Sequence, residues 1–236
     1  MAELAPDVVC LQEVTVKAAP LWQHAFETLG LACIAHPEPW SRDEARKRRL
    51  AVLTAAREPF EAAPIAGVPW PERALSARFA AGLELVNVHS PISPSPGLAK
   101  VRTHEAVFAH LAGGTGPRAL CGDLNTPRRE HADGSVWTFA RDRYGRLRAD
   151  RGERWDAAET ALIRGLEVHG FRDAFRALHG FDAKEPSWEW PQWGGGYRLD
   201  HLVVSEEVEV GACHYAHDWR REGLSDHSAL IARVRP

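Results

Sequence analysis

Residues 120–125 read Leu-Cys-Gly-Asp-Leu-Asn, an apolar strand-like run that leads into a glycine, a carboxylate and an amide. Four more segments, residues 8–13, 86–91, 197–201 and 224–228, likewise place Glu, His or Asp at the end of an apolar run. Carboxylates and imidazoles at strand ends converge on one rim of a sheet, where they suit a hard divalent cation and a phosphate ester. The pattern therefore predicts a metal-dependent phosphodiesterase site.

The composition is that of an ordinary globular protein. The chain has 236 residues, of which 44% are hydrophobic, and its formal net charge is −3. This length suits a single domain over residues 1–236, and the near balance of charges argues against a strongly cationic binding protein. The four cysteines show no C-x-x-C spacing, so we expect buried free thiols. Because no segment resembles a signal peptide or a membrane span, we expect a cytoplasmic protein, and a targeting segment upstream of residue 1 would be invisible here.

Hydrophobic periodicity predicts an α+β fold. An apolar stripe at helical spacing over residues 18–29, closed by Gly30, predicts a helix. Further helices are expected around residues 107–111 and 155–166, and strands at 7–11, 31–35, 50–54, 75–79, 83–85, 119–121, 199–204, 208–214 and 230–234. Loops are expected at 42–49, 90–97, 126–154 and 186–196. Many strands with few intervening helices favour a two-sheet sandwich with helices outside, and no glycine fingerprint supports a doubly wound fold.

Each motif has an ordinary structural interpretation when it is taken alone. Glu13 could be a solvated glutamate, Asp123 and Asn125 could cap a turn, and the Asp226-His227 pair could begin a helix. Five such segments in one fixed order favour a shared site instead.

Together the segments resemble the endonuclease/exonuclease/phosphatase superfamily, which includes exonuclease-III-like abasic-site nucleases, pancreatic-type deoxyribonucleases, sphingomyelinases and inositol-polyphosphate phosphatases. The matching segments extend from residues 11–13 to residues 225–227. The resemblance implies a four-layer α/β sandwich, with two mostly antiparallel β-sheets packed face to face and helices outside. It also implies a metal-dependent phosphoric ester hydrolase.

The resemblance assigns the metal to two acidic residues. Glu13 matches the metal-binding glutamate of the family, a hard oxygen ligand suited to Mg²⁺ or Mn²⁺. Asp226 matches the acid beside the catalytic histidine, a second contact to metal or water.

Catalytic roles are implied for five further residues. Asp123 matches the aspartate that orients or deprotonates the attacking water, and Asn125 matches the asparagine that hydrogen-bonds the phosphate. His227 matches the catalytic histidine, and Asp200 matches the carboxylate that fixes its tautomer. His89 stands where relatives of the deoxyribonuclease and sphingomyelinase type carry a histidine that contacts the phosphate or the leaving oxygen.

Two departures from the family pattern are visible. Family members usually begin with a strand that ends in a metal-binding asparagine or aspartate, followed by a helix, and both would precede the strand ending at Glu13. Because Met1 lies directly before that strand, the domain is expected to be N-terminally incomplete. The abasic-site nucleases also carry a tyrosine where this chain has His89.

The substrate indications lie in an aromatic segment. Residues 187–190 and 196–200 resemble the aromatic loop and the following strand of exonuclease-III-like enzymes, so Trp188 and Arg198 are expected to contact substrate. Packing at the base of a loop explains Trp188 equally well. The arginines between residues 128 and 148 are interspersed with acids, which favours a solvated loop, and Asp173 is expected to be structural.

These features predict a divalent-metal-dependent phosphodiesterase, with DNA the favoured substrate. The alternatives are an enzyme acting on a phospholipid or small phosphate ester, and a non-catalytic member of the same fold. We expect no stable protein partner and a monomer.

Overall fold

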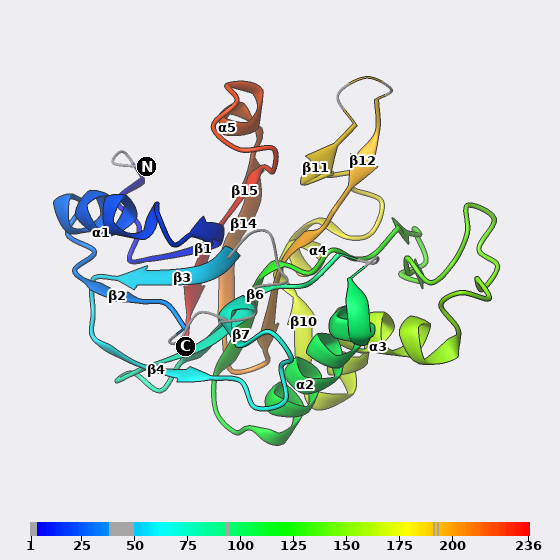
Figure 1. Cartoon of the computed structure of the whole chain (residues 1–236), viewed down its shortest axis with the longest axis horizontal. Coiled ribbons are helices and arrows are strands. Elements are labelled where there is room, and N and C mark those ends of the chain that lie inside the picture. The colour runs from blue at the N-terminus through cyan, green and yellow to red at the C-terminus, as the bar shows by residue number, and fades with distance from the viewer. Residues whose placement is uncertain (1–3, 38–49, 93–94, 191, 193) are drawn as a thin grey trace.

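The computed structural model of the chain describes residues 4–37, 50–92, 95–190, 192 and 194–236. Two β-layers pack face to face, and helices cover their outer sides (Figure 1). This arrangement confirms the predicted sandwich. No helix in the described part of the chain is long and apolar enough to cross a membrane.

The larger layer is a six-stranded sheet with the strand order β10-β13-β7-β6-β5-β4. Strands β6 and β7 pair in parallel, and each of the other neighbouring pairs is antiparallel. The strands are β4 (Phe60–Pro64), β5 (Ala74–Phe79), β6 (Glu84–His89), β7 (Arg118–Asp123), β10 (Phe171–Asp173) and β13 (Asp200–Ser205).

The second layer contains a three-stranded sheet, β1-β3-β2, and a separate ribbon, β14-β15. All pairs in this layer are antiparallel. The strands are β1 (Val8–Thr15), β2 (Cys33–Ala35), β3 (Leu50–Ala56), β14 (Glu209–Ala216) and β15 (Ala229–Arg235).

Side chains of the central strands alternate between two hydrophobic clusters, as the two-residue period of a strand requires. On β7, Leu120 joins the cluster under the helices, whereas Ala119 and Cys121 join the cluster between the two layers. On β13, Val203 and Val204 divide in the same way. A strand that is buried on both faces has a continuous apolar sequence, which explains why these strands were predictable.

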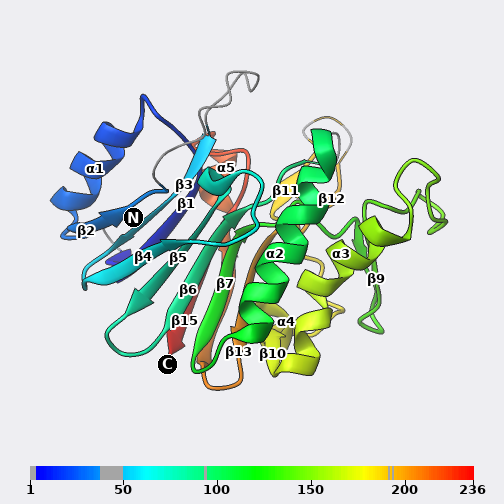
Figure 2. The same cartoon turned by 60° about the horizontal axis from the view of Figure 1, so that its bottom comes forward.

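Helices α2 (Ala99–Gly113) and α3 (Glu153–Ile163) lie against the outer face of the six-stranded sheet (Figure 2). Their residues Val107, Leu111 and Leu162 are buried in the cluster that they share with β6 and β7. On the opposite side, α1 (Ala19–Thr28) packs the fully buried Phe26 against Leu53 of β3. The predicted helices are thus confirmed.

A buried amide connects the two β-layers. The Nδ2 of Asn87 on β6 donates hydrogen bonds to the carbonyl oxygen of Leu53 (3.1 Å) and to Oγ1 of Thr54 (3.3 Å) on β3. Its Oδ1 accepts a hydrogen bond from Nε2 of Gln12 on β1 (2.8 Å). An unsatisfied amide in this position would be costly, so the bonds favour one relative placement of β6 and the Gln12–Glu13 segment.

Short elements were not predicted from the sequence. Residues 126–154, expected as a loop, contain β8 (Arg129–Glu130) and β9 (Val136–Trp137), and the expected loop 186–196 contains β11 (Trp188–Glu189) and the start of β12 (Gly196–Tyr197). Strands β4 and β10 and helices α4 (Ala174–His179) and α5 (His217–Arg221) were also missed. Elements this short carry too few residues to establish a period. The predicted loop 42–49 lies outside the described residues.

The four cysteines are free thiols, as the absence of paired spacing predicts. Cys213 is buried, as expected, whereas Cys10, Cys33 and Cys121 are only half-buried.

Gly122 permits the close approach of β6 and β7. Its φ is 126°, and a Cβ atom at this position would overlap the carbonyl oxygen of Val88. We expect Gly122→Ala to lower the free energy of unfolding by about 2–4 kcal/mol, because two paired strands must separate. Urea unfolding would measure this loss. The control is Gly113→Ala at the end of α2, where no atom lies within 4 Å of the added carbon; equal stability of the two variants would contradict the assignment.

Candidate active site

Three predicted residues lie in one row across adjacent strands. His89 ends β6, Asp123 ends β7, and the two residues are register partners in the parallel pair. Asp200 begins β13 and is the antiparallel register partner of the same Asp123. All three side chains are buried. Residues that are separated by up to 111 positions therefore meet at one rim of the sheet because of strand register alone.

Glu13 reaches this rim from the other β-layer. The pairing of β1 with β3 is irregular between Leu11 and Val14, and Glu13 adopts a left-handed conformation with φ 57°. A bulge of this kind redirects a side chain out of the alternating pattern. The Oε1 of Glu13 lies 3.6 Å from Nε2 of His89, and the side chain is 61% exposed. The carboxylate is thus at the rim and accessible to solvent.

His227 completes the cluster from the segment that precedes β15. Its Nδ1 lies 2.7 Å from Oδ2 of Asp200, which fixes the orientation of the imidazole. Ligand atoms of Asp123, Asp200 and His227 all lie within 4.8 Å of one another. The predicted Asp200–His227 pair is therefore present as a direct contact.

Asn125 holds the carboxylate of Asp123. Its backbone N–H donates to Oδ1 of Asp123 (2.8 Å), and its Nδ2 donates to Oδ2 (3.0 Å) and to the carbonyl oxygen of Ser90 (2.9 Å). The φ of Asn125 is 50°, a left-handed conformation that asparagine tolerates better than most residues. Both oxygens of Asp123 are thus oriented by the same neighbour.

The pKa values of the site follow from burial and from neighbouring charges. Burial, and then the negative charge of Asp200, raise the pKa of Asp123 to about 7. Burial lowers the pKa of His227, but the hydrogen bond and the charge of Asp200 outweigh it and bring the pKa to about 9. Burial, assisted by the positive charge of Arg73, holds the pKa of His89 well below 6.5. At neutral pH the two imidazoles consequently differ in charge.

The chemistry of the donor set fits a hard divalent cation. Glu13, Asp123 and Asp200 supply carboxylate oxygens, and the protonated His227 lies beside them as a hydrogen-bond donor. Burial, and then repulsion from the carboxylate of Asp200, raise the pKa of Asp123, and a bound cation would relieve this repulsion. Asp226 is exposed, and its negative charge contributes to the raised pKa of His227.

Arg73 is a site residue that the sequence motifs did not identify. It ends a short 3₁₀ helix (Pro71–Arg73) that leads into β5, and its Nη1 lies 3.0 Å from Nε2 of His89. It therefore places a guanidinium at the acidic rim. No motif surrounds Arg73 in the sequence, so only the packing of β5 beside β6 reveals this position.

An aromatic wall stands next to His227. Trp188 forms an isolated backbone bridge with His227, and its ring stacks on Tyr197 with centroids 6.0 Å apart. Trp190 contacts Trp188 edge-on at 4.6 Å and is 40% exposed, and Phe139 contacts Tyr197 at 5.2 Å. Trp188 itself is half-buried, and its backbone lies beside that of His227. Trp193 lies outside the described residues.

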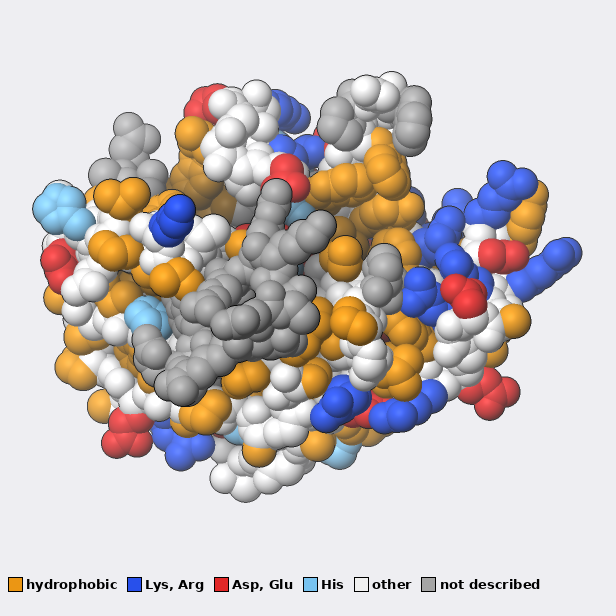
Figure 3. All heavy atoms as spheres, in the orientation of Figure 1, with side chains coloured by type: hydrophobic (Ala, Val, Ile, Leu, Met, Phe, Trp, Pro, Cys, Tyr) orange, Lys and Arg blue, Asp and Glu red, His pale blue; other side chains and the backbone are white. Residues whose placement is uncertain are grey.

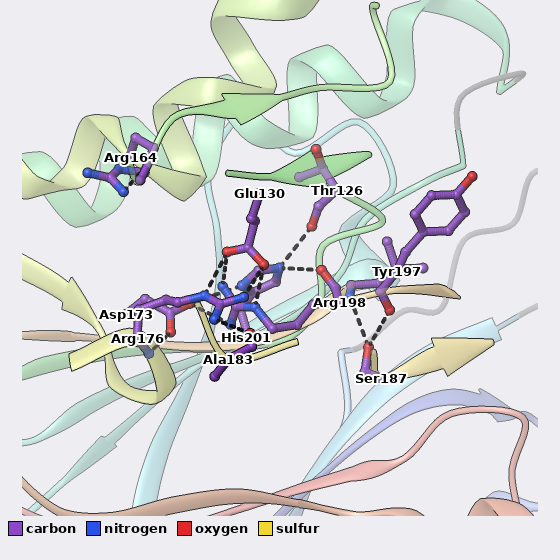
Figure 4. A network of polar contacts seen from close by, with 12 residues as sticks. Thr126, Glu130, Arg164, Asp173, Arg176, Ala183, Ser187, Tyr197, Arg198 and His201 are labelled. Atoms are coloured by element: carbon purple, nitrogen blue, oxygen red, sulfur yellow. Dashed lines mark hydrogen bonds and ion pairs between the residues drawn. The ribbon is translucent and has the colours of Figure 1, made fainter. Parts of the chain in front are cut away.

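The structure corrects the expectation that Arg198 binds substrate. Its guanidinium is 3% exposed and lies 2.6 Å from Oε1 of Glu130 and 2.8 Å from Oδ2 of Asp173 (Figure 4). Arg176 pairs with the same Glu130 at 2.6 Å. Because the Arg198 guanidinium is buried between two carboxylates, it is not available to a phosphate. Asp173 is structural, as expected, since it also accepts a hydrogen bond from the N–H of Arg176 and caps α4.

The arginine-rich segment between β9 and α3 lies at the right of the view in Figure 3, where basic and acidic side chains are mixed. Arg141 pairs with Asp156, and Arg148 pairs with Asp150 at 2.9 Å. Arg143 and Arg146 lie over the exposed ring of Tyr144. These local partners agree with the expectation of a solvated loop.

The two-layer sandwich gathers acids and imidazoles at one rim, an arrangement that suits a divalent cation and a phosphoric ester. The model of the Endonuclease/Exonuclease/phosphatase family matches residues 1–227, and the chain belongs to this family. Members of the family hydrolyse phosphoric esters, and the chain is an enzyme of this type. No curated protein sequence matches the chain significantly.

Solved structures share the fold. An AP endonuclease from Archaeoglobus fulgidus is 20% identical with a TM-score of 0.73, and the alignment covers 99% of this chain and 91% of that one. A single-residue variant of the 3′ phosphatase NExo from Neisseria, bound to a product DNA hairpin, is 19% identical with a TM-score of 0.70 over 98% and 90% of the two chains. TDP2 from D. rerio, complexed with a single-stranded DNA product, is 15% identical with a TM-score of 0.67 over 100% and 88%.

The charge of His227 gives a direct test of the site geometry. Folding raises its pKa from 6.5 to about 9, so the imidazolium stabilises the fold fully below pH 6.5, and this stabilisation is lost as the pH rises through 9. In metal-free buffer, we expect its ring signal in NMR, assigned by its loss in His227→Gln, to titrate near pH 9. Asp200→Asn should lower this midpoint by more than one unit, because the hydrogen bond and the charge of Asp200 are the largest raising causes. An unchanged midpoint would refute the pairing.

Proposed function

We propose that the protein is a divalent-metal-dependent phosphodiesterase that acts on DNA. The observation that carries the proposal is the convergence of Glu13, His89, Asp123, Asp200 and His227 at one rim. A phosphodiester is negatively charged and repels a nucleophilic water, so its hydrolysis needs neutralisation of that charge and alignment of the water.

The residues divide these tasks by their charge. Glu13 holds the cation, with Asp226 as a second contact to metal or water, and a bound Mg²⁺ or Mn²⁺ supplies Lewis-acid polarisation of a phosphoryl oxygen. Asp123, held by both hydrogen bonds from Asn125, orients the attacking water and can accept its proton.

The basic groups act on the phosphate. His227 is protonated at pH 7 and is oriented by Asp200, so its N–H can donate to a phosphoryl oxygen. His89 is neutral and can donate its ring N–H to the leaving oxygen. Asn125 can hydrogen-bond the phosphate if its amide leaves one of its present acceptors, Asp123 or Ser90. Arg73 adds a guanidinium beside His89, which suits the negative charge of the phosphate.

Two observations support DNA as the substrate. Two of the structural neighbours hold DNA products, one a hairpin and the other a single strand. Beside His227, the aromatic wall of Trp188, Trp190 and Tyr197 offers flat ring surfaces on which a base or sugar can stack.

Cleavage of bis-nitrophenyl phosphate tests the metal-dependent chemistry without a DNA contribution. The wild type should cleave this diester with Mg²⁺ or Mn²⁺, and EDTA should abolish the activity. We expect Glu13→Gln and His227→Ala each to lower kcat/KM by about 100-fold or more, because each removes a charge that the transition state requires. The control is Glu27→Gln, an exposed residue of α1. Equal rates for the wild type and both site variants would leave the proposal without support.

A substrate panel tests the preference for DNA. Abasic duplex DNA, intact DNA, single-stranded DNA, RNA and sphingomyelin vesicles should be compared under one metal condition, with a DNA substrate expected to be cleaved fastest. Trp188→Ala should lower kcat/KM for that DNA by about tenfold, through lost stacking, and leave bis-nitrophenyl phosphate cleavage unchanged. Tyr144→Ala, an exposed aromatic in the arginine-rich segment, is the matched control. Fastest cleavage of sphingomyelin would instead favour a lipid substrate.

A further inference from the structure

Two buried side chains of α2 reach the loops that carry the candidate active site. Lys100 and His104 are four residues apart, so they lie on the same face of the helix, and both are fully buried. The Nζ of Lys100 donates to the carbonyl oxygen of Asn125 (2.7 Å), and Nε2 of His104 lies 2.7 Å from Oγ of Ser90. The backbone carbonyl oxygen of Ser90 accepts a hydrogen bond from Nδ2 of Asn125 (2.9 Å). One helix face therefore supports both loops around Asn125.

Lys100 is held by a carboxylate that is saturated with donors. Its Nζ lies 2.6 Å from Oε1 of Glu159 on α3, and both side chains are 0% exposed. The same carboxylate accepts hydrogen bonds from Nε1 of Trp155, Oγ1 of Thr126 and the backbone N–H of Phe139, each at 2.7 Å. Glu159 thus connects α2 and α3 to the residue that directly follows Asn125.

Stability alone does not account for this ion pair. Burial removes the hydration of both charges, and this cost offsets much of their attraction. Apolar side chains of similar volume are therefore often as stabilising as a buried ion pair. A lysine ammonium does what an apolar side chain cannot do: it donates a directed hydrogen bond to a backbone carbonyl. The carbonyl that it holds belongs to Asn125, whose left-handed φ of 50° carries a small cost in free energy that the surrounding contacts offset.

We propose that Lys100 is a positioning residue for Asn125 and Asp123, and that Glu159 holds Lys100 in place. By fixing the carbonyl of Asn125, Lys100 keeps the N–H and Nδ2 of that residue 2.8 and 3.0 Å from the two oxygens of Asp123. Lys100 does not contact the reacting atoms; it acts through Asn125, and its positive charge also lowers the pKa of Asp123. The inference rests on the proposed function, because the readout is hydrolysis at Asp123.

The test removes both charges together, so that neither is left buried without a partner. Lys100→Met/Glu159→Gln and the wild type should be compared for Tm, kcat and KM on bis-nitrophenyl phosphate, at a temperature where both are folded. We expect kcat to fall by about tenfold or more with KM changed by less than about threefold, because misplacement of Asp123 affects the chemical step.

Two controls separate positioning from loss of stability. Leu162→Ala removes core packing from α3 and supplies a destabilised variant with the Lys100–Asn125 bond intact, and its kcat should stay within about twofold of the wild type. Arg102→Met removes an exposed charge from α2 and should also leave kcat unchanged. If the double variant keeps wild-type kcat, the positioning role is refuted.

A milder variant decides the question if the double variant does not fold. Thr126→Val removes only the hydroxyl bond to Glu159 and keeps the Lys100–Glu159 pair. Because the buried carboxylate loses one hydrogen bond, the Tm should fall slightly and Glu159 should hold Lys100 less tightly; we expect kcat to fall about threefold at constant KM, and an unchanged kcat would refute the part of the inference that assigns Glu159 to holding Lys100. Absence of hydrolysis in the wild type, by contrast, would refute the proposed function and not this inference alone.

Discussion

The register of β7 with its two neighbours is the constraint on which the candidate site depends. Asp123 faces His89 across the parallel pair and Asp200 across the antiparallel pair, so three distant segments meet in one row. A slip of one residue would turn each of these side chains to the opposite face of the sheet. Gly122 keeps β7 close enough to β6 for this register, because any Cβ there would overlap the backbone of Val88. The same strand register that packs the sheet therefore also places the site residues.

The electrostatics of the rim follow from this crowding. Bringing Asp123 and Asp200 together in a buried setting raises the pKa of Asp123, and the imidazolium of His227 compensates part of the repulsion. Arg73 adds a further positive charge at His89. A site with concentrated acids and ordered cationic donors suits both a divalent cation and an anionic ester, which is consistent with the hydrolases of the Endonuclease/Exonuclease/phosphatase family.

Two buried polar networks support the loop after β7. Lys100, held by Glu159, bonds the carbonyl of Asn125, and Nε2 of His201 lies 2.8 Å from the carbonyl oxygen of Thr126. The second network continues from His201 through Asp173 to Arg198, which makes Arg198 a support of the site and not a contact for substrate. Consecutive carbonyls that are both fixed by buried side chains leave this loop little conformational freedom.

The sequence by itself predicted the long strands and helices and the sandwich, and it marked Glu13, His89, Asp123 and His227 as candidate site residues, because each prediction depends on a local pattern of apolar runs ending in a chemically specific residue. Only the tertiary structure showed which charged residues outside such patterns are buried and which partners they bind. Lys100 and Glu159 are 59 positions apart and Arg198 and Glu130 are 68 apart, and no local pattern distinguishes them from solvated surface charges. Whether a charge is buried depends on which distant partner the fold brings to it, and that partner is set by strand register and helix packing.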